Sequence, residues 1–133
     1  MSALSLIMYM LPLELFSMKY TPYHPDFSAF YPAFLADYDR ARSCGRLMAD
    51  DRLPDNICGI SAVPGTSFTS FSFGGDPKTD FIPFVLYGRY RQEGERGRLP
   101  VAGEFSHAVN DGFHISRFFR ELEETADTLL DGE

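Results

Sequence analysis

The feature that most constrains this chain is a histidine at the junction of an expected strand and an expected helix. Residues 98–105 read as a strand, and an amphipathic helical pattern begins after Gly112. Between these two segments stand His107 and, four residues later, Asp111. A side chain at such a corner can be held in one place by the backbone on both sides. His107 is therefore the first candidate for a functional residue, although His107, Asp111 and Gly112 alone are a weak signal.

The composition indicates one globular domain spanning residues 1–133, with 44% hydrophobic residues. A net charge of −7 argues against nucleic acid and anionic membranes as main partners. Cys44 and Cys58 form neither a disulfide framework nor a metal-ligand spacing, so we expect the reducing cytoplasm. The apolar run at residues 3–11 is too short to span a bilayer, and its flanks do not match a secretory signal.

The first half of the chain is expected to contain strands, a loop and one helix. Residues 4–20 read as one or two strands, with a short buried helix as the alternative. Two prolines make residues 21–26 a loop. Apolar residues at spacings of three and four then predict a helix from Asp26, with a kink at Pro32 and an aromatic face that forms core. Residues 43–56 read as a surface loop.

The second half is expected to contain mostly strands. Residues 57–63 form a short buried strand, and residues 66–73 alternate hydroxyl and phenyl side chains with the period of two that is typical of a strand. Residues 81–91 and 98–105 are two more strands, joined by a polar, glycine-bearing hairpin turn at residues 93–97.

The last helix begins after Gly112, and either Asn110 or Asp111 can cap its N-terminus. His114, in its first turns, is expected to lie on the helix surface. The order of elements predicts an α+β fold with a largely antiparallel or mixed sheet and helices packed on one side.

Three segments stand in an order that resembles the C-terminal part of the chloramphenicol acetyltransferase family. They are I-S-A-V-P with S-F-T-S-F (residues 60–64 and 67–71), the hairpin, and H-A-V-N-D-G-F-H (residues 107–114). The H-x-x-x-D-G signature is shared with dihydrolipoyl acyltransferases and condensation domains of peptide synthetases, whereas S-F-T-S-F points to the antibiotic-acetylating branch. The match runs from about residue 14 to the end. It implies the family's CoA-dependent acyltransferase sandwich of two layers, truncated at the N-terminus.

The resemblance implies transfer of acetyl from acetyl-CoA to a hydroxyl of chloramphenicol or a similar acceptor, without a metal. It places His107 as the general base and Ser61 as the hydrogen-bond donor that stabilises the oxyanion. Asp111 is structural in the family, where it pairs with an arginine that lies in the missing segment. The alternative reading of Asp111 is a plain helix cap. The resemblance also implies a cytoplasmic homotrimer that confers antibiotic resistance.

Aromatic residues are expected to bind both substrates. The resemblance assigns the acceptor pocket to Phe16, Phe71, Phe73, Phe81 and Phe84, and the coenzyme site to Tyr90. Leu86 stands where the family often has a threonine near the reaction centre. The alternative function is that of a truncated, catalytically inactive relative that acts at most as a binding or assembly partner.

Overall fold

The computed structural model describes residues 3–5, 17–63, 65–72, 74 and 81–130. They belong to two compact units. The first unit contains the chain up to Gly74 together with Ile82–Glu104, and the second contains Phe81 and the chain from Phe105 onward. Each unit is described by itself below.

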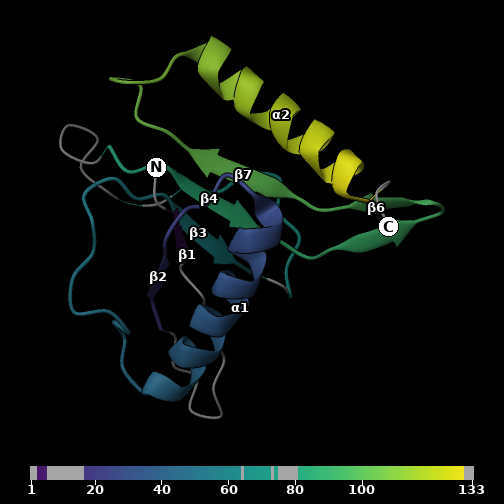
Figure 1. Cartoon of the computed structure of the whole chain (residues 1–133). Helices are drawn as coiled ribbons and strands as arrows, with labels where there is room; N and C mark the ends of the chain where they lie inside the picture. The colour runs from purple at the N-terminus through teal and green to yellow at the C-terminus, as the bar shows by residue number, and fades with distance from the viewer. Residues whose placement is uncertain (1–2, 6–16, 64, 73, 75–80, 131–133) are drawn as a thin grey trace. The chain divides into compact units, whose positions relative to one another are not determined.

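A five-stranded sheet forms the centre of the first unit (Figure 1). In spatial order its strands are β2 (Lys19–Thr21), β1 (Ala3–Ser5), β3 (Gly59–Ala62), β4 (Phe84–Tyr87) and β7 (Val101–Glu104). Strand β3 pairs in parallel with both neighbours, whereas β1–β2 and β4–β7 are antiparallel. The predicted α+β class is confirmed, and the sheet is a mixed one with a parallel centre. The apolar run at residues 6–11 lies outside the described residues.

Helix α1 (Phe27–Cys44) confirms the helix that was predicted from the spacing of apolar residues. Asp26 caps it, because its carboxylate accepts a hydrogen bond from the backbone N–H of Ser28 at 2.9 Å. The helix ends at Gly45, which has a left-handed φ of 62°. Pro32 lies inside the helix, as the sequence indicated. The helix packs beside β2.

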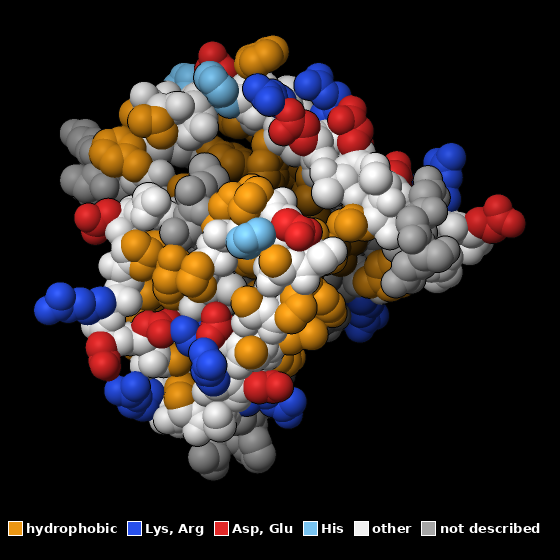
Figure 2. All heavy atoms as spheres, in the orientation of Figure 1, with side chains coloured by type: hydrophobic (Ala, Val, Ile, Leu, Met, Phe, Trp, Pro, Cys, Tyr) orange, Lys and Arg blue, Asp and Glu red, His pale blue; other side chains and the backbone are white. Residues whose placement is uncertain are grey.

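The aromatic face of α1 is only partly buried. Ala41, near its C-terminal end, is buried, and Phe30 and Phe34 are half-buried with ring centroids 6.1 Å apart. Phe27 and Tyr31, near its start, are exposed and stack on each other at 5.4 Å. The prediction of a core face is therefore wrong at the start of the helix. Figure 2 shows other hydrophobic side chains at the surface as well.

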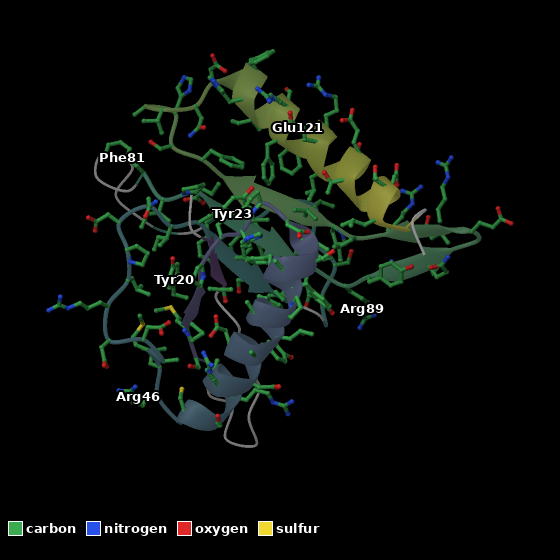
Figure 3. The ribbon with its side chains drawn as sticks, in the orientation of Figure 1. Tyr20, Tyr23, Arg46, Phe81, Arg89 and Glu121 are labelled. Carbon is green, nitrogen blue, oxygen red and sulfur yellow. The ribbon has the colours of Figure 1, made fainter. Side chains whose placement is uncertain are left out.

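A largely buried lysine joins β2, α1 and the loop that follows α1. Lys19 Nζ lies 3.5 Å from Asp37 Oδ1 and 2.7 Å from Asp50 Oδ1. Asp50 Oδ2 also accepts a hydrogen bond from the backbone N–H of Tyr20 at 2.6 Å (Tyr20 is labelled in Figure 3). Arg40 reaches Asp37 Oδ1 from the surface at 3.2 Å. Because opposite charges face each other, the cost of removing them from water is offset.

Residues 65–72 are irregular, so the strand predicted for residues 66–73 is wrong over the described part. The Thr66 N–H donates to the Val63 carbonyl at 3.0 Å, and the Thr66 carbonyl accepts from the Arg89 N–H at 2.9 Å. A Cβ at position 88 would lie 2.8 Å from the Thr66 oxygen, so Gly88 permits this close approach. The turn takes the chain out of the sheet, although the hydroxyl and phenyl side chains alternate as they would in a strand.

The predicted strand at residues 81–91 divides into β4 and a short strand, β5 (Arg91–Glu93). Strand β5 pairs antiparallel with β6 (Arg96–Arg98). The connecting turn contains Gly94 at a φ of 64°, a conformation that favours glycine. The hairpin turn expected at residues 93–97 is confirmed.

The second unit is built on helix α2 (Gly112–Leu130), which confirms the predicted final helix. The Phe105 ring meets the edge of Phe118 at a centroid distance of 5.2 Å, which anchors the segment before the helix. On the helix surface Arg117 Nε lies 2.6 Å from Glu121 Oε1 (Glu121 is labelled in Figure 3). Among the described helices, none has the length and apolar character needed to cross a membrane.

Candidate active site

Ser61 lies on β3 in the middle of the sheet, and its residue is 5% exposed. Its register partner on β4 is Leu86, which is 3% exposed. Side chains of register partners point to the same face of a sheet, so the hydroxyl has an apolar neighbour. A hydroxyl in such surroundings interacts more strongly with a negative charge than it does in water.

Among the described residues of the first unit, two belong to the predicted acceptor pocket. Phe84 begins β4, and its ring lies across β3, where a Cβ at Gly59 would be 2.3 Å from the ring. Only a glycine at position 59 leaves this space free. Phe71 is exposed, and its ring centroid lies 6.4 Å from that of Phe68.

Tyr90, the predicted coenzyme contact, is 60% exposed beside the hairpin. Its ring lies over Gly97, where an added Cβ would be 2.6 Å from Cε2, and its hydroxyl donates to the side-chain oxygen of Gln92. Phe81 is exposed and belongs to the second unit (it is labelled in Figure 3). Phe16 and Phe73 lie outside the described residues.

A tight turn in the second unit holds His107. The Ser106 carbonyl accepts hydrogen bonds from the backbone N–H groups of Val109 at 3.2 Å and Asn110 at 3.0 Å. The side-chain amide of Asn110 donates to the same oxygen at 3.1 Å. Asn110 is half-buried, whereas the His107 side chain is exposed. The turn therefore presents the imidazole at the surface of its unit.

The turn also determines where His107 carries its proton. His107 Nδ1 lies 2.9 Å from the carbonyl oxygen of Asn110. A carbonyl oxygen can only accept, so Nδ1 must carry the hydrogen of the neutral ring. The lone pair is then on Nε2, where it can accept a proton from another molecule.

Asp111 caps helix α2, which confirms the capping alternative. Its Oδ1 accepts hydrogen bonds from the backbone N–H groups of Phe113 at 3.0 Å and His114 at 3.1 Å. His114 Nδ1 lies 2.7 Å from the same oxygen, so Nδ1 carries a proton and cannot also accept from the Asp111 N–H at 3.3 Å. The backbone bond from His114, followed by its imidazole and the bond from Phe113, holds the pKa of Asp111 below its ordinary value.

We expect Asp111→Ala to lower the melting temperature at pH 7 more than Asp111→Asn does, because asparagine keeps a capping oxygen. The lowered pKa of Asp111 means that its ionised form stabilises the folded state. This contribution is complete above about pH 4 and is lost as the pH falls through the folded-state pKa. Thermal melts followed by circular dichroism should therefore show the gap between wild type and Asp111→Asn closing in acid. A gap that stays constant with pH would contradict the charged cap.

The first unit also contains a concave region that no sequence pattern indicated. It is an open pocket of about 420 Å³ lined by Arg46, Met48, Asp50, Asp51, Arg52 and Leu53.

The two cysteines differ in their surroundings. Cys44 has a pKa below its ordinary value because Ser17 hydrogen-bonds its sulfur, whereas burial raises the pKa of Cys58. Within the described ranges, no three His, Cys, Asp or Glu side chains gather as a metal site would require.

The fold is that of a known class of acyltransferase. The structure is similar to a solved chloramphenicol acetyltransferase with a TM-score of 0.74 at 24% sequence identity, covering 93% of this chain and 60% of that one. Residues 4–123 match the sequence model of the family described as chloramphenicol acetyltransferase. The chain belongs to the chloramphenicol acetyltransferase family.

Curated relatives agree with this assignment. The chain is 36% identical over 118 residues to chloramphenicol acetyltransferase 3 of Escherichia coli, covering 88% of this chain and 55% of that protein. It is 30% identical over 113 residues to chloramphenicol acetyltransferase of Staphylococcus aureus, covering 84% of this chain and 52% of the relative. The chain therefore spans about half the length of the curated relatives that it matches.

Proposed function

We propose that this chain transfers acetyl from acetyl-CoA to a hydroxyl of chloramphenicol or a similar acceptor. The observation that carries the proposal is the hydrogen bond from His107 Nδ1–H to the Asn110 carbonyl. It leaves an unprotonated Nε2 on an exposed imidazole, within the sequence segment on which the family assignment rests.

In the proposed reaction, His107 Nε2 removes the proton of the acceptor hydroxyl while that oxygen attacks the thioester carbonyl carbon. The carbonyl becomes an oxyanion, to which the Ser61 hydroxyl donates a hydrogen bond. The oxyanion then collapses, the carbon–sulfur bond breaks, and the coenzyme thiolate takes the proton back from His107. The acetyl group passes directly to the acceptor, so no residue of the chain is acetylated.

We assign the acceptor pocket to Phe16, Phe71, Phe73, Phe81 and Phe84, and a coenzyme contact to Tyr90. The exposure of Phe71, Phe81 and Tyr90 supports this assignment, because flat rings at a surface can cover an aromatic acceptor or a nucleotide.

We further propose that the chain acts as a homotrimer with the site between neighbouring copies. Within the second unit, Val109 and Phe113, which flank the His107 turn and the start of α2, are 61% and 68% exposed. Large apolar side chains beside a catalytic group are favourable where a second surface covers them. Size-exclusion chromatography with light scattering tests this assembly, and a stable monomer at working concentration would contradict it.

The function is tested by incubating the purified chain with acetyl-CoA and chloramphenicol and detecting acetylated product by mass spectrometry. This readout avoids thiol reagents, which would also react with the free Cys44 and Cys58. We expect product only when both substrates are present, and a rate about a hundredfold lower for Ser61→Ala, which lacks the oxyanion donor. A folded wild-type chain that forms no product would instead support the inactive relative.

A further inference from the structure

Asn110 is hydrogen-bonded through both its side chain and its backbone. Its side-chain amide donates to the Ser106 carbonyl at 3.1 Å, and its backbone N–H donates to the same oxygen at 3.0 Å. Its own carbonyl accepts the hydrogen on His107 Nδ1 at 2.9 Å. The residue that closes the turn is therefore also the residue that bonds the imidazole.

The direction of the Asn110 carbonyl depends on the backbone angles of Asn110. A side chain that is bound to Ser106 restricts those angles, as short polar side chains do when they bond the local backbone. The peptide group that contains this carbonyl continues into Asp111, which the first turn of α2 holds through Phe113 and His114. The carbonyl is thus fixed by the amide on one side and by the helix cap on the other.

We propose that Asn110 is a positioning residue for His107: its side-chain amide closes the turn at residues 106–110 and so aims the carbonyl that keeps the imidazole hydrogen on Nδ1. Asn110 touches neither substrate in this role and acts only through the ring of His107. The catalytic consequence rests on the proposed function, because it requires Nε2 to be the base. The choice of tautomer does not depend on that function and can be measured without any substrate.

Two variants and a matched control test the proposal. Asn110→Asp keeps the shape of the side chain but places an anionic oxygen against the Ser106 carbonyl, and Asn110→Ala removes the amide. Asn56→Asp makes the same chemical change at the other asparagine of the chain, an exposed loop residue of the first unit. Each full-length chain is first checked for folding by circular dichroism.

The first readout is the tautomer of His107, from long-range proton–nitrogen NMR spectra recorded at alkaline pH, where imidazoles are neutral. The His107 signals are assigned by their loss in His107→Gln. We expect Nδ1–H in wild type and in Asn56→Asp. In both Asn110 variants the ratio of Nδ1–H to Nε2–H should fall about tenfold, which is the strength of one hydrogen bond.

The second readout is acetyl transfer, for which we expect kcat to fall up to about tenfold in the Asn110 variants while the KM for chloramphenicol is unchanged. An Nε2–H tautomer in wild type, or an unchanged ratio in the folded variants, would overturn the proposal. Because kcat follows the fraction of His107 in the Nδ1–H form, a clear fall in that fraction with unchanged kcat would also overturn it. If no chain acetylates chloramphenicol, the proposed function fails, and the tautomer ratios still decide whether Asn110 positions His107.

Discussion

Replacing His107 with glutamine is expected to lower the rate of chloramphenicol acetylation by about 10²- to 10⁴-fold, the usual contribution of a general base. The glutamine amide can still bond the Asn110 carbonyl, which now accepts from His107 Nδ1 at 2.9 Å. It cannot, however, take a proton from the acceptor. Because His107 is exposed in its unit, the melting temperature should remain close to that of wild type. Product formation by mass spectrometry gives the rate, and circular dichroism gives the stability.

A matched control comes from His24→Gln. His24 is also exposed, and its Nδ1 accepts a hydrogen bond from the backbone N–H of Asp26 at 3.0 Å. The substitution is chemically the same but lies in the loop before α1, so we expect an unchanged rate. If His107→Gln were as active as the His24→Gln control and wild type, His107 would not be the base. If both abolished activity, a general loss of structure would explain the result instead.

The local parts of the candidate site could be predicted from the sequence. The start of α2, its cap at Asp111 and the hairpin turn at Gly94 depend on residues within four positions of one another. Such signals survive in a single sequence because the interacting groups are neighbours along the chain. The bond between His107 and Asn110 is just as local, but it depends on the turn conformation and on a backbone carbonyl, so no residue pattern reveals it.

The pairing of Asp111 with His114 was missed, although a signal for it existed. His114 was expected at the helix surface, and it is exposed there, but its Nδ1 bonds the capping carboxylate at 2.7 Å. A spacing of three residues at a helix start places two side chains side by side. The family resemblance directed attention to an arginine elsewhere, whereas the structure provides a histidine partner within the same corner.

Contacts between distant segments could not be predicted. The parallel pairing of β3 with β4 sets Ser61 beside Leu86, and nothing in either segment specifies that register. The strand predicted at residues 66–73 failed for a related reason, because the contact of Thr66 with Arg89 joins two separate parts of the chain. Lys19 is a further example, since its partners Asp37 and Asp50 come from different elements.

The second large expected effect is that of replacing Lys19. Lys19→Met is expected to lower the free energy of unfolding by about 3 kcal/mol, the low end of the cost of breaking a buried ion pair. Methionine has a similar length but no charge, so it leaves Asp37, whose side chain is 9% exposed, without its lysine. Arg40 keeps its bond to Asp37, which is why the higher values in the usual range are not expected. Urea unfolding followed by circular dichroism measures the change.

Arg40→Met is the matched control, because Arg40 bonds the same Asp37 oxygen at 3.2 Å with a side chain that is 73% exposed. A solvent-exposed pair contributes little, so this variant should lose less than about 1 kcal/mol. The two variants remove one positive charge each and differ in burial, since Lys19 is only 12% exposed. Equal losses would show that burial of the lysine adds nothing. A larger loss of stability in Lys19→Met than in Arg40→Met would mean that Lys19 holds β2, α1 and the loop at Asp50 together. Lys19 would then support the sheet that carries Ser61.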